Sequence, residues 1–253
     1  MVDLTGKVAL ITGASRGIGR ATAVEMAQAG AQIAVNYYSH GEEAEEVAEE
    51  VRRSGSEAIT CGADVSNREA VESMVKATVT AFGRLDILVS NAYYSKREPF
   101  LELSLEAMRR TIDVTLWGAF HTAQVAARQM VAQKQGGSIL FISSVLSFIP
   151  VATSLPYNTA KAGINQMSAT IANELTSHRI RSNVIEPGWT DTPGERQYST
   201  EEQLQEGGKK LPWGRLATPQ DIARSATFLS SDAADYITGA VLRVDGGYWL
   251  QQP

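Results

Sequence analysis

The sequence predicts an α/β fold, with one domain in which a seven-stranded parallel sheet carries helices on both faces. Short runs rich in β-branched residues alternate with longer segments of helical periodicity along the whole chain, as in repeated β-α-β units. No internal repeat, low-complexity tract or long linker divides the 253 residues. Because α/β folds of this length commonly share one core, we expect residues 1–253 to form a single domain.

The expected strands and helices follow one another in strict alternation. Strands are expected where short apolar runs occur, and helices where apolar residues recur at i, i+3, i+4 and i+7. Right-handed crossovers between parallel strands then place the helices on both faces. The strands are expected at residues 8–11, 33–36, 58–61, 87–89, 138–142, 182–185 and 241–244. The helices are expected at residues 17–29, 42–54, 68–82, 105–133, 157–176 and 219–229.

The composition excludes several classes of function. A net charge of −5, without clustered Lys and Arg, gives no surface that neutralises nucleic-acid phosphates. No basic segment precedes an early apolar stretch and no apolar run is long enough to span a bilayer, so neither secretion nor membrane insertion is expected. Cys61 is the single cysteine, which suits a reducing compartment, and the three histidines are too scattered for a metal site. We therefore expect a cytoplasmic protein that binds no metal, nucleic acid or membrane.

A glycine-rich turn joins the first expected strand to the first expected helix. Gly13 permits a sharp turn, Gly17 lets a phosphate approach the backbone, and Gly19 lets the helix pack closely. The free N–H groups and the positive end of the helix dipole would face a pyrophosphate. In this context the turn indicates a dinucleotide site of the Rossmann type. Contacts to the cofactor are also expected from Ser15, Arg16 and Ile18.

The spacing Gly-x-x-x-Gly-x-Gly after Thr12 resembles the cofactor motif of the short-chain dehydrogenase/reductase family, and further family landmarks follow as far as residues 245–247. By this resemblance Asp64 holds the adenine, although Asp64 or Ser66 would also suit a helix N-cap. The segment at residues 187–192 resembles the one that holds the nicotinamide carboxamide. The resemblance implies cofactor contacts from Tyr37, Ser39, Asp64, Val65, Asn91, Ala92, Tyr157, Lys161, Pro187, Gly188, Thr190 and Thr192.

Three residues resemble the catalytic groups of that family. Tyr157 and Lys161 are four residues apart on one face of an expected helix that Pro156 is suited to start, and Ser144 follows the fifth expected strand. The resemblance implies that Tyr157 is the general acid or base, that Lys161 binds the nicotinamide ribose, and that Ser144 orients the carbonyl. An adjacent ammonium should also lower the pKa of the phenol. We therefore expect hydride transfer between a nicotinamide and a carbonyl or secondary-alcohol carbon.

Ser90, Tyr93 and Thr115 depart from the family pattern. Tyr93 replaces a glycine that permits close passage beside the cofactor, so we expect it to narrow that side or to line the substrate entrance. Thr115 replaces an asparagine that helps to hold a water chain to the lysine. We expect Thr115 to hydrogen-bond a water or a carbonyl of its own helix. Because threonine reaches less far than asparagine, we predict slower proton exchange rather than inactivity.

The end of the second expected strand bears on the choice of cofactor. Residues 36–39 read Asn-Tyr-Tyr-Ser and lack the carboxylate that binds an NAD ribose and repels a 2′-phosphate. Arg16 lies in the glycine turn, where the family uses a basic residue for NADP. NADP(H) is therefore favoured and NAD(H) stays open, with a solvated loop position as the alternative for Arg16.

Residues 188–214 form the least regular stretch and follow the sixth expected strand, so we expect a substrate lid at the ligand edge of the sheet, with an inert surface loop as the alternative. The resemblance implies a homotetramer with isologous interfaces on the two long helices. Within the family, the glucose 1-dehydrogenase and 3-oxoacyl-carrier-protein reductase branches look most similar. An epimerase or dehydratase, or a nucleotide-binding sensor without catalysis, are the alternative functions.

Overall fold

The computed structural model describes residues 2–251, which contain a parallel sheet of seven strands in the order β3-β2-β1-β4-β5-β6-β7. The strand order reverses between β1 and β4, so the carboxyl ends of the central strands open a crevice there. This confirms the expected fold class. The strands are β1 (Val8–Ile11), β2 (Gln32–Tyr37), β3 (Ala58–Gly62), β4 (Ile87–Ser90), β5 (Gly137–Ile142), β6 (Ile180–Pro187) and β7 (Val241–Val244).

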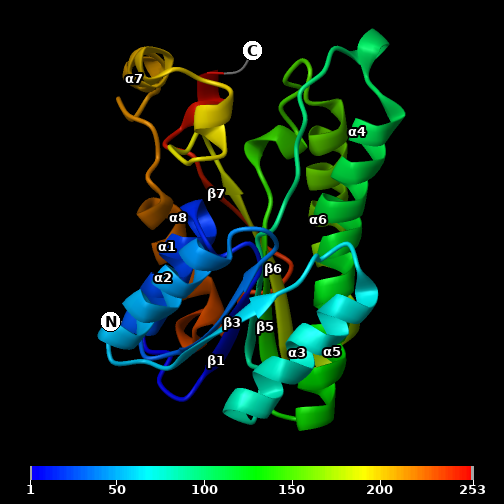
Figure 1. The fold of residues 1–253 in the computed structure, drawn as a ribbon, viewed down its shortest axis with the longest axis vertical. Coiled ribbons are helices and arrows are strands. Elements are labelled where there is room, and N and C mark those ends of the chain that lie inside the picture. Colours follow the sequence, from blue (N-terminus) through cyan, green and yellow to red (C-terminus); the bar gives the residue numbers. More distant parts are fainter. Residues whose placement is uncertain (1, 252–253) are drawn as a thin grey trace.

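Helices cover both faces of the sheet (Figure 1). On one face lie α1 (Gly17–Gln28), α2 (Gly41–Arg53) and α8 (Pro219–Ser230), and on the other lie α3 (Arg68–Phe82), α5 (Gly118–Gln133) and α6 (Leu155–Leu175). Alternate residues of each strand point to opposite faces, so β1 places Ala9 and Ile11 in one apolar core and Leu10 in the other. The sheet is therefore packed between two apolar cores, which hold the strand ends at the site in place.

The segment expected as one helix at residues 105–133 is interrupted. It consists of α4 (Leu105–Thr111), a turn of π-helix at Ile112–Trp117 and then α5. A π-helical turn widens the helix locally, which the apolar spacing does not reveal. Thr115 lies in this turn.

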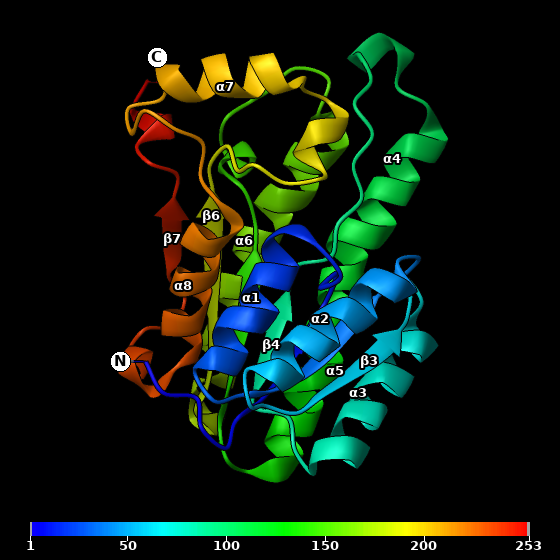
Figure 2. The ribbon, with the colours of Figure 1, turned by 60° about the vertical axis from the view of Figure 1, so that its left-hand side comes forward.

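A helix also occurs where the sequence predicts an irregular stretch. Helix α7 (Glu201–Lys210) lies across the carboxyl end of the sheet (Figure 2) and begins with a capping box between Thr200 and Gln203. Gly207 and Gly208 argue against a helix by propensity, yet a Cβ at Gly207 would lie 2.3 Å from the ring of Trp189. The glycine is therefore needed for packing. Short 3₁₀ turns lie at Phe100–Glu102, Val145–Ser147 (η3), Thr176–His178, Glu195–Gln197 (η5), Asp232–Ala234 and Tyr248–Gln251.

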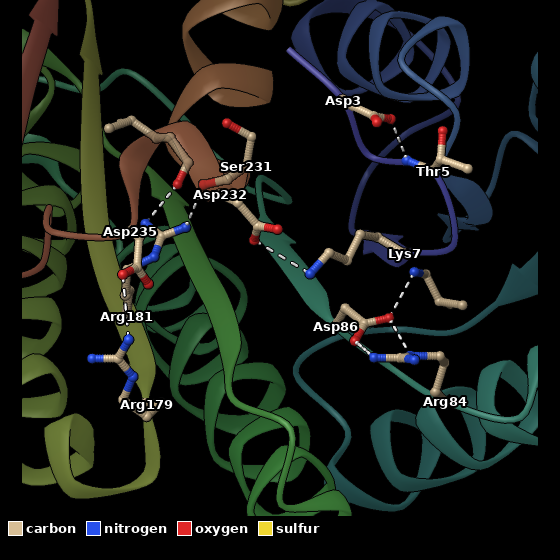
Figure 3. Close-up of polar contacts among 12 residues, drawn as sticks. Asp3, Thr5, Lys7, Arg84, Asp86, Arg179, Arg181, Ser231, Asp232 and Asp235 are labelled. Carbon is tan, nitrogen blue, oxygen red and sulfur yellow. Dashed lines mark hydrogen bonds and ion pairs between the residues drawn. The ribbon is translucent and has the colours of Figure 1, made fainter.

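Polar contacts tie the chain together at the amino end of the sheet (Figure 3). The Asp86 carboxylate is almost fully buried and accepts hydrogen bonds from the Val8 N–H at 2.9 Å and from the Arg84 guanidinium at 2.5 and 2.7 Å. Arg181 donates to the carbonyls of Leu229 and Ser231 near the end of α8. Among residues 2–251, no helix is long and apolar enough to cross a membrane.

Candidate active site

A cavity of about 880 Å³ lies at the carboxyl ends of the strands. It is lined by the glycine turn, by the segments that follow β2 to β6, and by residues of the 188–198 stretch. Every residue expected at the site lines it except Gly19, which is buried beneath the turn. Within residues 2–251 no cluster of side chains is suited to hold a metal ion.

The glycine turn has the backbone that the sequence predicts. Gly13 and Gly17 have φ of +61° and +58°, which side chains rarely adopt. A Cβ at Gly19 would lie 2.4 Å from the Gly13 carbonyl oxygen and 2.7 Å from the Asn91 amide. Gly19 is thus required because α1 packs against the turn itself. The first N–H groups of α1 face the cavity without a side-chain cap from Arg16.

Two buried asparagines hold this turn. Asn91 Nδ2 donates to the carbonyls of Thr12 at 2.9 Å and Gly13 at 3.1 Å. The Gly13 N–H donates to Asn36 Oδ1 at 3.2 Å, and Asn36 Nδ2 donates to the Cys61 carbonyl at 3.0 Å. Asn36 was not expected at the site, although a polar residue at the end of an apolar strand was a usable signal. The turn is therefore pre-organised.

Asp64 is an anion whose oxygens are already bonded. Oδ1 accepts from the Ser66 N–H at 2.9 Å and its hydroxyl at 2.7 Å, while Oδ2 accepts from Arg110 at 2.9 Å. Burial alone would raise the pKa of Asp64, but the bonds to Ser66 and Arg110 lower it below its usual value. The N-cap of α3 is Asn67, which accepts from the Ala70 N–H, so the capping alternative for Asp64 or Ser66 is wrong. Arg110 was not foreseen, because its contact spans 46 residues.

Arginines line the cavity at the glycine turn and beside the residue that follows β2. Arg16 is exposed, lines the cavity and has no ion-pair partner within the described part of the chain. The Arg110 guanidinium lies 5.6 Å from the ring centre of the exposed Tyr38. Tyr37 packs against Gly62, where a Cβ would lie 3.1 Å from its hydroxyl, and the Ser39 hydroxyl lies 3.0 Å from His40 Nδ1. This end of the cavity suits an anionic group.

Ser144, Tyr157 and Lys161 all line the cavity. Lys161 Nζ lies 5.3 Å from the ring centre of Tyr157 and donates to the Ile142 carbonyl at 2.6 Å. Ser144 precedes η3, and its Oγ accepts from the Leu146 N–H at 3.1 Å. Helix α6 therefore supplies the phenol and the amine, and the end of β5 supplies the hydroxyl.

Burial controls the protonation of these groups. It lowers the pKa of Lys161 to about 7, because an ammonium loses its hydration there. Burial also raises the pKa of the Tyr157 phenol, with a further rise from Tyr93 and an opposing effect of the Ser144 hydroxyl. The lowering of the phenol pKa that is expected from Lys161 does not outweigh this rise.

Tyr93 lines the cavity as expected. Its ring meets that of Tyr157 edge to face, with the ring centres 5.7 Å apart and the planes at 70°. Lys161 Nζ lies 5.8 Å from the ring centre of Tyr93. The Tyr93 hydroxyl rests on Gly194, where a Cβ would lie only 2.2 Å away. This chain has Tyr93 where the family pattern has glycine, and Gly194 leaves the space that the tyrosine hydroxyl occupies.

Thr115 has a role that the sequence did not indicate. It is fully buried, and its hydroxyl donates to the Tyr94 carbonyl at 3.0 Å and accepts from the Tyr94 N–H at 3.1 Å. The expectation that Thr115 bonds to a water or to its own helix is therefore corrected. The residue fastens the π-helical turn to the segment that carries Tyr93.

Side chains of the segment at residues 93–97 also contact η5. Arg97 pairs with Glu195 at 3.1 Å, and its guanidinium lies 4.1 Å from the ring centre of Tyr198. The Tyr198 hydroxyl donates to the Ser95 carbonyl at 2.8 Å. These contacts hold the chain that follows Gly194 across the mouth of the cavity.

Comparisons with known proteins find similar sequences and structures over almost the whole chain. A family model described as Enoyl-(Acyl carrier protein) reductase matches residues 13–249. Glucose 1-dehydrogenase 2 of Bacillus subtilis (strain 168) is 37% identical over 249 residues, which cover 98% of this chain and 96% of that protein. L-rhamnose 1-dehydrogenase (NAD(P)(+)) of Sphingomonas sp. (strain SKA58) is 38% identical over 248 residues and 98% of both chains. A solved short-chain type dehydrogenase/reductase from Mycobacterium marinum has a TM-score of 0.92 at 36% identity, covering 99% of this chain and 98% of its own.

Proposed function

The chain belongs to the short-chain dehydrogenase/reductase family and is a nicotinamide-dependent oxidoreductase of a small molecule, in which we propose that Ser144, Tyr157 and Lys161 perform the proton chemistry. The observation that carries this proposal is the convergence of a hydroxyl, a phenol and an amine inside one cavity that begins at the glycine turn. Separate roles elsewhere in the fold would not require these three side chains to share one dry site.

The residues present fit a nicotinamide dinucleotide. The positive end of α1 and the glycine turn would hold the pyrophosphate, and Lys161 would hold the nicotinamide ribose. When bound, the nicotinamide ring supplies or accepts the hydride. Tyr157 gives its proton to the substrate oxygen during reduction and removes it during oxidation, while Ser144 donates a hydrogen bond to the same oxygen. With a pKa of about 7, Lys161 is able to pass that proton on at neutral pH.

We favour NADP(H) as the cofactor. Arg16, in the glycine turn, is exposed and has no ion-pair partner within residues 2–251, so it is the cation that a 2′-phosphate would bind, while Arg110 is bonded to Asp64. The only carboxylate of this region that lines the cavity is Asp64, which is already paired with Arg110. These contacts support a 2′-phosphate more than a free ribose hydroxyl, and dual use with NAD(H) fits the relative from Sphingomonas.

For the substrate we propose a polyhydroxylated carbonyl compound of the aldose type. The cavity lining includes aromatic rings together with hydroxyl, amide and carboxylate groups, a combination that suits the C–H and O–H groups of a sugar. These lining residues are Tyr93, Tyr94, Ser95, Trp189, Glu195, Gln197 and Tyr198. Two relatives are named for the oxidation of glucose and rhamnose.

A substrate and cofactor panel tests this proposal. D-glucose, L-rhamnose, acetoin, a steroid alcohol and a 3-hydroxyacyl thioester are each assayed with NADP⁺ and NAD⁺, and the reduced cofactors are titrated by fluorescence. We expect net cofactor reduction with an aldose, and tighter binding of NADPH than of NADH. Substrate conversion without net cofactor turnover would instead favour an epimerase or dehydratase. Binding without any conversion would contradict the proposed catalytic roles.

The proposed enzyme has a lid over the cavity and assembles as a homotetramer. We propose that residues 188–214 form a lid, because Arg97 and Ser95 bind η5 and its neighbour Tyr198 across the cavity mouth. A homotetramer with isologous interfaces on the two long helices is the assembly that we expect for this chain. Light scattering coupled to size-exclusion chromatography checks the assembly, since a monomeric mass would contradict it.

A further inference from the structure

Glu186 is a buried carboxylate that the proposed chemistry does not use. It lies in β6 directly before Pro187 and is 1% exposed, so its charge depends on partners inside the protein. Oε1 accepts hydrogen bonds from the Ser147 hydroxyl at 2.5 Å and the Asn165 side-chain amide at 2.7 Å. Oε2 accepts from Arg243 Nε at 3.0 Å. Four segments of the chain therefore meet at one carboxylate.

The three donors come from elements that surround the catalytic groups. Ser147 closes η3, the turn that starts directly after Ser144. Asn165 lies on α6 one helical turn beyond the catalytic lysine, on the same face of the helix. Arg243 stands opposite Glu186 in the register of β6 and β7. The carboxylate thus links the serine turn to the helix that carries the phenol and the amine.

Arg243 strengthens this link from the other side. Its guanidinium lies 4.3 Å from the ring centre of Phe148, which directly follows η3, and 5.0 Å from that of Trp249. The side chain of Arg243 is 40% exposed whereas that of Glu186 is 1% exposed, so the cation keeps contact with solvent while the anion does not. Removal of the negative charge would leave Arg243 hydrated but would weaken the charge-assisted hydrogen bonds that hold Ser147 and Asn165.

We propose that Glu186 is a positioning residue, which fixes the turn bearing Ser144 relative to Tyr157 and Lys161 through its bonds to Ser147 and Asn165. The inference rests on the proposed roles of those three catalytic groups. Because two groups that act on one oxygen tolerate little misplacement, a shift of about 1 Å costs on the order of 100-fold in rate. Glu186 itself reaches no reacting atom and acts through the position of Ser144.

Asp86 offers a matched control at the opposite end of the sheet. It is also a nearly buried carboxylate that accepts three hydrogen bonds, two of them from one arginine (Figure 3). Its partners Arg84 and Val8 do not line the cavity. Asp86→Asn therefore perturbs the fold in the same chemical way as Glu186→Gln without touching the serine turn.

The test compares Glu186→Gln with Asp86→Asn in the full-length protein, using NADP⁺ with the faster of D-glucose and L-rhamnose. We expect Glu186→Gln to lower kcat about tenfold or more while the Kd for NADPH stays within about threefold. Asp86→Asn should lower the Tm by a similar amount yet keep kcat within about twofold. A Glu186→Gln enzyme with the kcat of the wild type, or an equal loss of kcat in Asp86→Asn, would overturn the positioning role.

A second variant covers the case in which Glu186→Gln does not fold. Ser147→Ala removes one bond to the carboxylate and keeps the ion pair with Arg243. We expect it to lower kcat about threefold or more in the wild type, but by less than about twofold when Ser144 is already alanine. An equal loss in both backgrounds would mean that Ser147 does not act through Ser144. If the wild type oxidises neither sugar, the aldose proposal fails, and the same variants are compared with the panel substrate that the wild type does turn over. An active wild type with unaffected variants rejects the positioning role alone.

Discussion

Among single residues, Tyr93 distinguishes this cavity most clearly from the family pattern. Its ring packs against the edge of Tyr157, and its hydroxyl rests on Gly194 in the chain that crosses the cavity mouth. A side chain at this position removes space beside the reacting oxygen. The size of the substrate should therefore be limited by one residue that is not itself part of the proton chemistry.

Tyr93→Gly should widen the range of substrates. We expect kcat/KM for a steroid ketone to rise about tenfold relative to that for acetoin, because the lost ring opens the cavity next to Tyr157. Steady-state reduction of both ketones with NADPH measures this ratio. Tyr93→Phe keeps the ring and should keep the ratio of the wild type; an unchanged ratio in Tyr93→Gly would show that the ring does not limit access.

Among the elements, the π-helical turn is anchored by two hydrogen bonds of Thr115. The Thr115 hydroxyl binds both the N–H and the carbonyl of Tyr94 and so joins α4 and α5 to the segment after β4. Thr111, one turn earlier on the same helix, is equally buried but its hydroxyl has no partner within the described residues. A comparison of the two threonines therefore separates the contribution of the hydrogen bonds to stability from the contribution of burying the side chain.

Thr115→Val should lower the free energy of unfolding by about 1–3 kcal/mol, because it leaves the Tyr94 peptide group without its partner. Thr111→Val should be neutral or slightly stabilising, since it exchanges an unpartnered hydroxyl for a methyl group. Urea unfolding of both variants measures the difference. Equal changes in the free energy of unfolding of the two variants would show that the hydrogen bonds between Thr115 and Tyr94 do not stabilise the fold.

Most helices and strands were predictable from the sequence, whereas the π-helical turn and α7 were not. Strands and most helix ends were predictable because apolar periodicity reports burial, and the four-residue spacing of Tyr157 and Lys161 already placed both on one helical face. The π-helical turn was not predictable, because it leaves the apolar pattern unchanged. Helix α7 was missed because Gly207 is selected by its contact with Trp189, which overrides propensity. The bonds of Arg110 and Glu186 join residues far apart in sequence.

For the whole molecule, the buried amine of Lys161 links activity to stability. Its pKa of about 7 in the folded protein is below the ordinary value of 10.5. Between these two pH values the unfolded chain binds more protons than the folded one, so the contribution of this residue to stability rises with pH. Below pH 7 the full penalty for the buried charge applies.

Lys161→Met removes that penalty. We expect the free energy of unfolding of the variant, relative to the wild type, to be most favourable near pH 6 and to lose on the order of 3 kcal/mol of this advantage by pH 10. Guanidinium unfolding across this range measures the trend. Lys76→Met on the exposed side of α3 serves as the control for the loss of a lysine. A constant difference between Lys161→Met and the wild type from pH 6 to pH 10 would contradict the burial of a charged amine.

The most direct test of the proton chemistry is the Tyr157→Phe variant, measured for turnover of the best substrate and for NADPH binding. The phenylalanine keeps the ring that packs against Tyr93 and removes only the hydroxyl that exchanges the proton. We predict a loss of kcat of about 1,000-fold with a Kd for NADPH within about threefold of the wild type. A Tyr157→Phe enzyme that keeps a tenth or more of the wild-type kcat would show that another group moves the proton.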